Sequence, residues 1–192
     1  FMRLFLLLLI VLSLKSCAVP VIGGVGAIAL SSSAQEKGLG TSINDKVIYV
    51  KLRNVIHNWN PSVSQKISIS VDNGSILVTG QLENINTKID LTKTIWDVSG
   101  VKEVNNQVQI SKISNLKNIA KDLASLGEIR AKLMASKELN SLNFSVDVVN
   151  NIAYISGVAS NDEEIAIVTQ IAQEARFIIE VQNFVKVNKD KR

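Results

Sequence analysis

Few side chains in this sequence have the types and spacing that catalysis needs. The chain has one histidine, His57, which follows the apolar Ile56, so we expect it on a helix surface and not acting as a base. The acidic run 162–164 could supply carboxylates for acid–base chemistry, but an N-cap at Asn161 with acidic first-turn residues accounts for it. The glycines at 23–26 lack the preceding strand and following Lys-Ser/Thr of a phosphate loop. We therefore expect no enzymatic activity and no cofactor.

The one cysteine, Cys17, rules out an internal disulfide framework and a cysteine-based zinc site, and with one histidine there is no cluster for a metal. Its surroundings favour acylation instead. Arg3 precedes an apolar run at 4–12 that is too short to span a bilayer, as in a secretory signal peptide. The residues at 14–17 then resemble a bacterial lipobox, although Lys15 is atypical within it. Acyl chains on Cys17 would contribute about 0.8 kcal/mol per buried methylene to membrane anchoring.

This interpretation divides the amino-terminal region into a lipoprotein signal peptide at 1–16 and a lipidated Gly/Ser-rich tether at 17–42. Ala18 lacks the acidic side chain that is linked to inner-membrane retention, so the resemblance to a lipobox implies the outer membrane. The alternative is a plain signal peptide that is cut elsewhere, with Cys17 a chance residue.

Composition and charge exclude some classes of partner. The 192 residues are 46% hydrophobic and 20% charged, which is typical of a folded protein. Net charge is +4, and removal of Arg3 and Lys15 with the signal peptide leaves 19 basic against 17 acidic side chains, or +2. That charge is too small to indicate nucleic-acid binding.

The rest of the chain is an internal duplication with an offset of 77 residues. The segment 75–80 recurs at 152–157, and each copy is an apolar run that ends in a small hydroxyl residue and a glycine. Without any gap, the offset pairs Asp45 with Asp122, Arg53 with Arg130, Gly80 with Gly157, Asn84 with Asn161 and Lys112 with Lys189. We take Gly80, Gly157, Asn84 and Asn161 as structural residues.

In each copy the hydrophobic pattern predicts a helix, a hairpin, a second helix and a closing strand. In the first copy, Asn44 or Asp45 caps a helix that ends before Pro61, and Gly80 ends the second hairpin strand. Asn84 caps the second helix. The side chains that we expect in the helix cores are Ile48, Leu52, Val55, Ile56, Trp59, Ile85, Ile89, Ile95 and Trp96 in the first copy, and Leu123, Leu126, Ile129, Leu133 and Met134 in the first helix of the second.

Each copy resembles a BON domain. The resemblance rests on Val78-Thr79-Gly80 and Ile155-Ser156-Gly157, on Asn84 and Asn161, and on the Val-x-x-Val-x-Asn pattern at 101–106, which recurs as Ile-x-x-Val-x-Asn at 178–183. It implies an α+β fold, with two tandem αββαβ domains that each pack a mixed three-stranded sheet on two helices. We expect domains at 43–112 and 120–192 and a linker at 113–119. Phe177 replaces the glycine found at Gly100, so we expect a different, more apolar corner there.

The resemblance also implies the function, which is non-catalytic binding to anionic phospholipid membrane and support of envelope integrity, on the periplasmic side of the Gram-negative outer membrane. The candidate lipid-binding residues lie in and before the first helix of the second copy: Lys117, Lys121, Leu123, Leu126, Arg130 and Lys132. An ordinary amphipathic helix with a solvated basic face would have the same pattern. The alternative function is a periplasmic scaffold whose domains bind a protein partner in the envelope, for example through a sheet edge.

Overall fold

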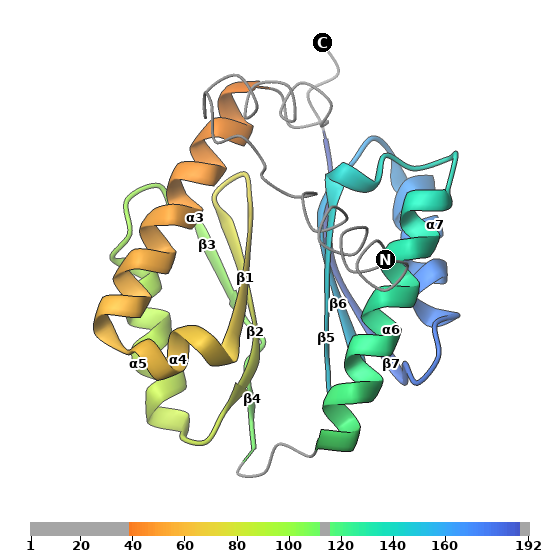
Figure 1. Ribbon diagram of the computed structural model, residues 1–192. Coiled ribbons are helices and arrows are strands. Elements are labelled where there is room, and N and C mark those ends of the chain that lie inside the picture. The colour runs from red at the N-terminus through yellow and green to blue at the C-terminus, as the bar shows by residue number, and fades with distance from the viewer. Residues whose placement is uncertain (1–38, 112–115, 189–192) are drawn as a thin grey trace, which may run out of the picture.

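The structure, a computed structural model, describes residues 39–111 and 116–188 (Figure 1). The first domain contains α3 (Leu39–Trp59), α4 (Pro61–Lys66), β1 (Ile67–Asp72), β2 (Ser75–Leu82), α5 (Ile85–Trp96), β3 (Glu103–Asn106) and β4 (Gln109–Ile110). The second contains α6 (Leu116–Ala135), the 3-10 turn η1 (Ser141–Asn143), β5 (Phe144–Val149), β6 (Ile152–Ala159), α7 (Asp162–Gln173) and β7 (Glu180–Val187). The two expected αββαβ domains are confirmed.

Both sheets have the same topology, with the second strand of the hairpin in the centre. β2 is antiparallel to β1 and parallel to β3, and β6 relates to β5 and β7 in the same way. The closing strand of the first domain is interrupted after Asn106, so its last part, β4, pairs separately with β2.

The helices of each domain cover the outer face of its sheet, and the two sheets turn their other faces toward each other (Figure 1). Side chains therefore alternate along the central strands between two buried environments. Ile76 and Val78 belong to the core of the first domain, whereas Leu77 between them packs with Tyr154 in a smaller cluster between the sheets. All buried residues of the two domain cores lie between Ile48 and Ala175, so a chain that begins at Ala18 retains both cores.

Gly80 and Gly157 do not end their strands, as the sequence pattern suggested, but lie inside β2 and β6. Their φ angles are +125° and +145°, and each lies against the backbone that leads into the first hairpin strand. A Cβ at Gly80 would lie 2.3 Å from the carbonyl oxygen of Lys66, and one at Gly157 would lie 2.1 Å from that of Asn143. Only glycine fits this close crossing.

Asp45 is not the N-cap of the first helix, because α3 already begins at Leu39. Its buried carboxylate accepts hydrogen bonds from the backbone N–H groups of Asn73 and Gly74 in the hairpin turn, at 2.9 and 3.0 Å. Asp122 does the same for Asn150 and Asn151, both at 2.8 Å. The repeated aspartate thus ties the first helix of each domain to its hairpin.

The first helix of the second domain also begins earlier than expected. α6 starts at Leu116, inside the segment expected to be a linker.

The repeated asparagines form hydrogen bonds at two other points of each domain. Asn84 and Asn161 cap α5 and α7, as predicted, by accepting from Asn86 N (2.8 Å) and Glu164 N (2.9 Å). In the closing strands, Asn106 donates to Thr92 Oγ1 at 2.8 Å, and Asn183 donates to Thr169 Oγ1 at 2.7 Å. The second pair of bonds attaches each closing strand to the second helix of its domain.

The assignment of Trp59 and Trp96 to the core is wrong, because both are exposed, Trp96 by 51%. Each is the last residue of its helix, where few neighbouring elements can cover a large ring. The exposed set also includes Val55, Ile85, Ile89, Leu123 and Met134. Each helix buries only the line of residues that points directly at its sheet, as Leu91 and Ile95 do in α5.

No helix in the described residues is long and apolar enough to cross a membrane.

Candidate functional site

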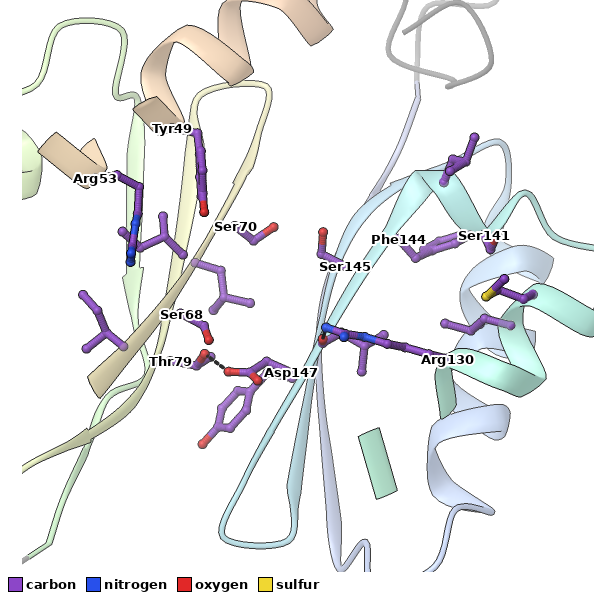
Figure 2. Close-up of a pocket in the computed structure, with 18 residues that line it drawn as sticks. Tyr49, Arg53, Ser68, Ser70, Thr79, Arg130, Ser141, Phe144, Ser145 and Asp147 are labelled. Carbon is purple, nitrogen blue, oxygen red and sulfur yellow. Dashed lines mark hydrogen bonds between the residues drawn. The ribbon is translucent and has the colours of Figure 1, made fainter. Parts of the chain in front are cut away.

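The two domains enclose a cleft of about 590 Å³ between β1 with α3 on one side and β5 with α6 on the other (Figure 2). Arg53 reaches it from α3 and Arg130 from α6, and Ser68 and Ser145 line it from the facing strands. Apolar side chains complete the walls, among them Ile69, Leu133, Met134 and Phe144. The volume of this cleft lies within the range of small-molecule sites.

Hydrogen bonds between the sheets border the cleft. Thr79 of β2 donates a short hydrogen bond to Asp147 of β5, and the hydroxyls of Ser156 and Ser70 are 2.8 Å apart. These bonds link the two domains directly and leave Asp147 as an acidic group in the cleft wall.

The two arginines are held in similar ways. Arg53 Nη1 donates to the carbonyl oxygen of Ser64 at 3.1 Å, and Arg130 Nη2 donates to that of Val146 at 3.2 Å. A guanidinium has five N–H donors, and these are the hydrogen bonds that the two side chains make within the described part of the chain. Most donors are therefore available to a ligand in the cleft.

An ion pair joins the domains at another point, where Lys186 of β7 makes a short contact with Glu103 of β3. The hydrogen bond from Lys186, together with one from Asn105, holds the pKa of the Glu103 carboxyl below its usual value. Burial between the sheets raises the pKa of the Tyr154 hydroxyl, which accepts a hydrogen bond from Gln109.

The six candidate lipid-binding residues of α6 do not form one surface. Lys121 and Lys132 lie on the flank that meets the α7 side of the domain, where Lys132 pairs with Glu128 at 3.3 Å and approaches Glu174 at 3.9 Å. Lys117 precedes Lys121 by one helical turn and shares its flank. The pairing with two carboxylates leaves Lys132 little positive charge to offer a membrane.

The other three candidates point elsewhere. Arg130 lines the interdomain cleft, and Leu126 packs partly against the core of the second domain. Leu123 is exposed, by 64%, but it lies two positions from Lys121, so the helix turns it away from the lysine flank.

Two apolar residues that the sequence pattern did not single out as lipid-binding lie near the lysine flank. The Lys121 ammonium lies 5.6 Å from the centre of the Phe177 ring, and Ile179, two residues further along, is 79% exposed. Phe177 has a φ of +66°, so its backbone keeps the positive φ of Gly100, and the expectation of a different backbone conformation is wrong. The exposed ring makes the corner more apolar, as expected. An exposed phenylalanine in place of a glycine at a left-handed position is costly for folding. This replacement is the feature of the sequence that indicates a role for Phe177 at the surface.

The residues considered for catalysis are placed as predicted. His57 is exposed on the last turn of α3, and Asp162–Glu164 form the first turn of α7. Glu164 accepts from Ser160 N at 2.9 Å, which fits its expected role in helix capping. Among the described residues, no three His, Cys, Asp or Glu side chains could hold a metal ion together. Cys17 lies outside the described residues.

Comparison with known proteins identifies similarity over both repeats. Residues 44–112 and 126–189 each match the family described as BON domain. An uncharacterized protein in the gshII 5' region of Anaplasma centrale is 26% identical over 150 residues, covering 78% of this chain and 98% of that protein. Outer membrane lipoprotein DolP of Haemophilus influenzae is 26% identical over 156 residues, covering 81% and 80%. Osmotically-inducible protein Y of Escherichia coli is 23% identical over 150 residues, covering 77% and 75%.

Proposed function

Because the chain belongs to the BON domain family and carries two copies of the domain, we propose that it is a non-catalytic protein of the Gram-negative cell envelope that binds phospholipid membrane. Support of outer-membrane integrity, and anchoring by acylated Cys17 on the periplasmic side, are parts of the same proposal. The similarity to a protein named as an outer membrane lipoprotein supports this placement.

The main support for membrane binding is that basic and exposed apolar side chains lie close together at one edge of the second domain. We define the membrane face as Lys117, Lys121, Phe177 and Ile179. Lys117 is exposed, and Lys121 lies against the exposed ring of Phe177. Basic side chains beside exposed apolar ones are suited to an anionic bilayer surface.

The two kinds of side chain contribute separately to such a contact. Each lysine near an anionic surface contributes about 1 kcal/mol, which is screened by salt. Insertion of Phe177 and Ile179 among the headgroups adds an apolar contribution that salt does not weaken. Binding should therefore fall with salt without disappearing.

Vesicle sedimentation of the chain that begins at Ala18 tests this proposal. Binding to anionic phosphatidylglycerol vesicles should exceed binding to neutral phosphatidylcholine vesicles. The double substitution Lys117→Glu and Lys121→Glu should weaken anionic binding by more than tenfold, because it reverses two charges. Ile179→Asp should weaken binding to both kinds of vesicle.

A matched control places the same charge changes away from the membrane face. Lys51 on α3 and Lys137 after α6 are exposed, so Lys51→Glu with Lys137→Glu changes net charge equally. Equal losses in the two double variants would show that net charge alone drives binding and would contradict the assigned face.

The alternative function, a scaffold for an envelope protein, is favoured by the open edge of the second sheet. β7 is eight residues long, and within the described residues no strand pairs with its outer side. Such an edge can accept a strand from a partner. A partner that crosslinks to β7 in a variant without vesicle binding would favour the scaffold.

A further inference from the structure

Two residue pairs that the 77-residue repeat conserves line the interdomain cleft. Under the 77-residue offset Arg53 matches Arg130 and Ser68 matches Ser145, and all four line the cleft. The other repeated residues described above hold a turn, a strand crossing, a helix start or a closing strand within their own domain. Each arginine donates one hydrogen bond within its own domain, and the two arginines and two serines also line the cleft from its opposite walls (Figure 2).

We propose that this cleft binds a single-chain amphiphile with a phosphate headgroup, and that Arg53 and Arg130, on opposite walls, supply the positive charge that attracts the phosphate. The guanidinium group presents paired N–H donors that match phosphate oxygens, and such charge-assisted bonds are strong. The hydroxyls of Ser68 and Ser145 supply further donors on facing strands.

The charge of the lining selects the headgroup. Arg53 and Arg130 together outweigh Asp147, so the charged side chains of the lining sum to one positive charge. A phosphate without an attached cation compensates this charge, whereas a zwitterionic headgroup brings no net charge to it.

The apolar side chains of the cleft indicate that the ligand has an apolar part in addition to its phosphate. Met134 is 77% exposed and lines the cleft with Phe144 and Ile69. An alkyl chain along this wall would remove apolar surface from water, and a flexible thioether adapts to such a chain. The volume of about 590 Å³ lies in the range of sites that enclose small ligands.

Calorimetric titration of the chain that begins at Ala18 with dodecyl phosphate, kept below its micelle concentration, tests the proposal. We expect one bound molecule per chain. Arg53→Gln and Arg130→Gln should each weaken binding about tenfold or more, because each removes a charged donor. Met134→Glu, at an exposed position that folding tolerates, should have a similar effect by placing a charge beside the alkyl chain. Arg176→Gln, outside the cleft, is the matched control and should leave affinity unchanged.

Two further ligands test separately the need for an alkyl chain and the need for a negatively charged headgroup. Inorganic phosphate should bind much more weakly than dodecyl phosphate, and equal affinity would overturn the assignment of an amphiphile. Dodecylphosphocholine should also bind weakly, and equal affinity would overturn the role of charge. Unchanged binding by the two arginine variants and Met134→Glu would overturn the location. Binding in the cleft does not depend on the membrane face, so Lys117→Glu with Lys121→Glu should weaken binding to anionic vesicles by more than tenfold and leave dodecyl phosphate binding intact.

Discussion

Gln109 in β4 of the first domain donates a hydrogen bond from Nε2 to the hydroxyl of Tyr154 in the second domain, at 3.1 Å. The same amide nitrogen donates to the carbonyl oxygen of Val149 at 3.3 Å, and the amide oxygen accepts a short hydrogen bond from Asn150. One side chain therefore uses both ends of its amide on the other domain. Because Tyr154 is buried between the sheets, its hydroxyl depends on this partner.

Removal of this contact should reveal coupling between the domains. Gln109→Ala leaves a buried hydroxyl without its partner and should cost about 1–3 kcal/mol in the free energy of unfolding. Tyr154→Phe removes the hydroxyl itself, so the double variant should be more stable than the sum of the single losses predicts, by about 1 kcal/mol. Urea denaturation of the four proteins measures this coupling. Tyr49→Phe, at an exposed ring, is the control, and strictly additive losses would contradict the contact.

Replacing Gly80 or Gly127 by alanine should have opposite effects on stability, because only Gly80 lies at a close backbone crossing. Gly80→Ala should destabilise the chain by about 2 kcal/mol or more, because the new Cβ meets the Lys66 carbonyl oxygen at a left-handed backbone position. Gly127→Ala, inside α6, has nothing within 4 Å of the new Cβ and should stabilise by roughly 0.5–1 kcal/mol. Thermal and urea denaturation compare the two. A small effect of Gly80→Ala would show that the strands can separate there.

The buried carboxylate of Asp45 should be more important for stability than an exposed one. Asp45→Ala removes the acceptor of two turn N–H groups and should cost about 2–4 kcal/mol. Asp45→Asn keeps one acceptor oxygen and should fall between the wild type and Asp45→Ala. Asp90→Ala, which removes an exposed ion pair with Lys93, should cost less than about 1 kcal/mol. Similar losses for Asp45→Ala and Asp90→Ala in urea denaturation would contradict the role of the turn.

The duplication and the element order could be predicted from the sequence because local signals determine them. The constant offset, the helix caps at Asn84 and Asn161 and the alternation along β1 and β5 need no knowledge of distant contacts. The central strands carry a further signal in their sequence. A continuous apolar run such as 152–155 indicates a strand with both faces buried, and β6 indeed contacts its own helices on one face and the first domain on the other.

The cleft and the membrane face could not be predicted in the same way, since each depends on contacts between distant segments. Arg130 and Lys132 are two residues apart in α6, yet one lines the cleft and the other pairs with carboxylates. The proximity of Phe177 to Lys121 depends on how the corner after α7 folds over α6. Helical spacing places these side chains on different flanks, but only the tertiary packing shows what each flank meets.

The ion pair between Glu103 and Lys186 predicts that acid weakens the link between the domains. The pKa of Glu103 is lowered in the folded chain from its usual value of 4.5, so the ionised form is the one that folding favours. Its contribution is complete above the unfolded pKa and is lost as pH falls through the folded pKa. Because the two side chains remain 46% and 51% exposed, we expect no more than about 1 kcal/mol, and less at high salt.

Denaturation of the wild type and Glu103→Gln across about pH 7 to about pH 3 measures this contribution. Glu103→Gln should be the less stable protein at neutral pH, and the difference should shrink as the wild-type carboxylate is protonated. In a Lys186→Met background the carboxylate has lost its main partner, so Glu103→Gln should change stability less and with a weaker dependence on pH. If the difference between wild type and Glu103→Gln stayed constant over the whole range, the ion pair would contribute nothing to the folded state.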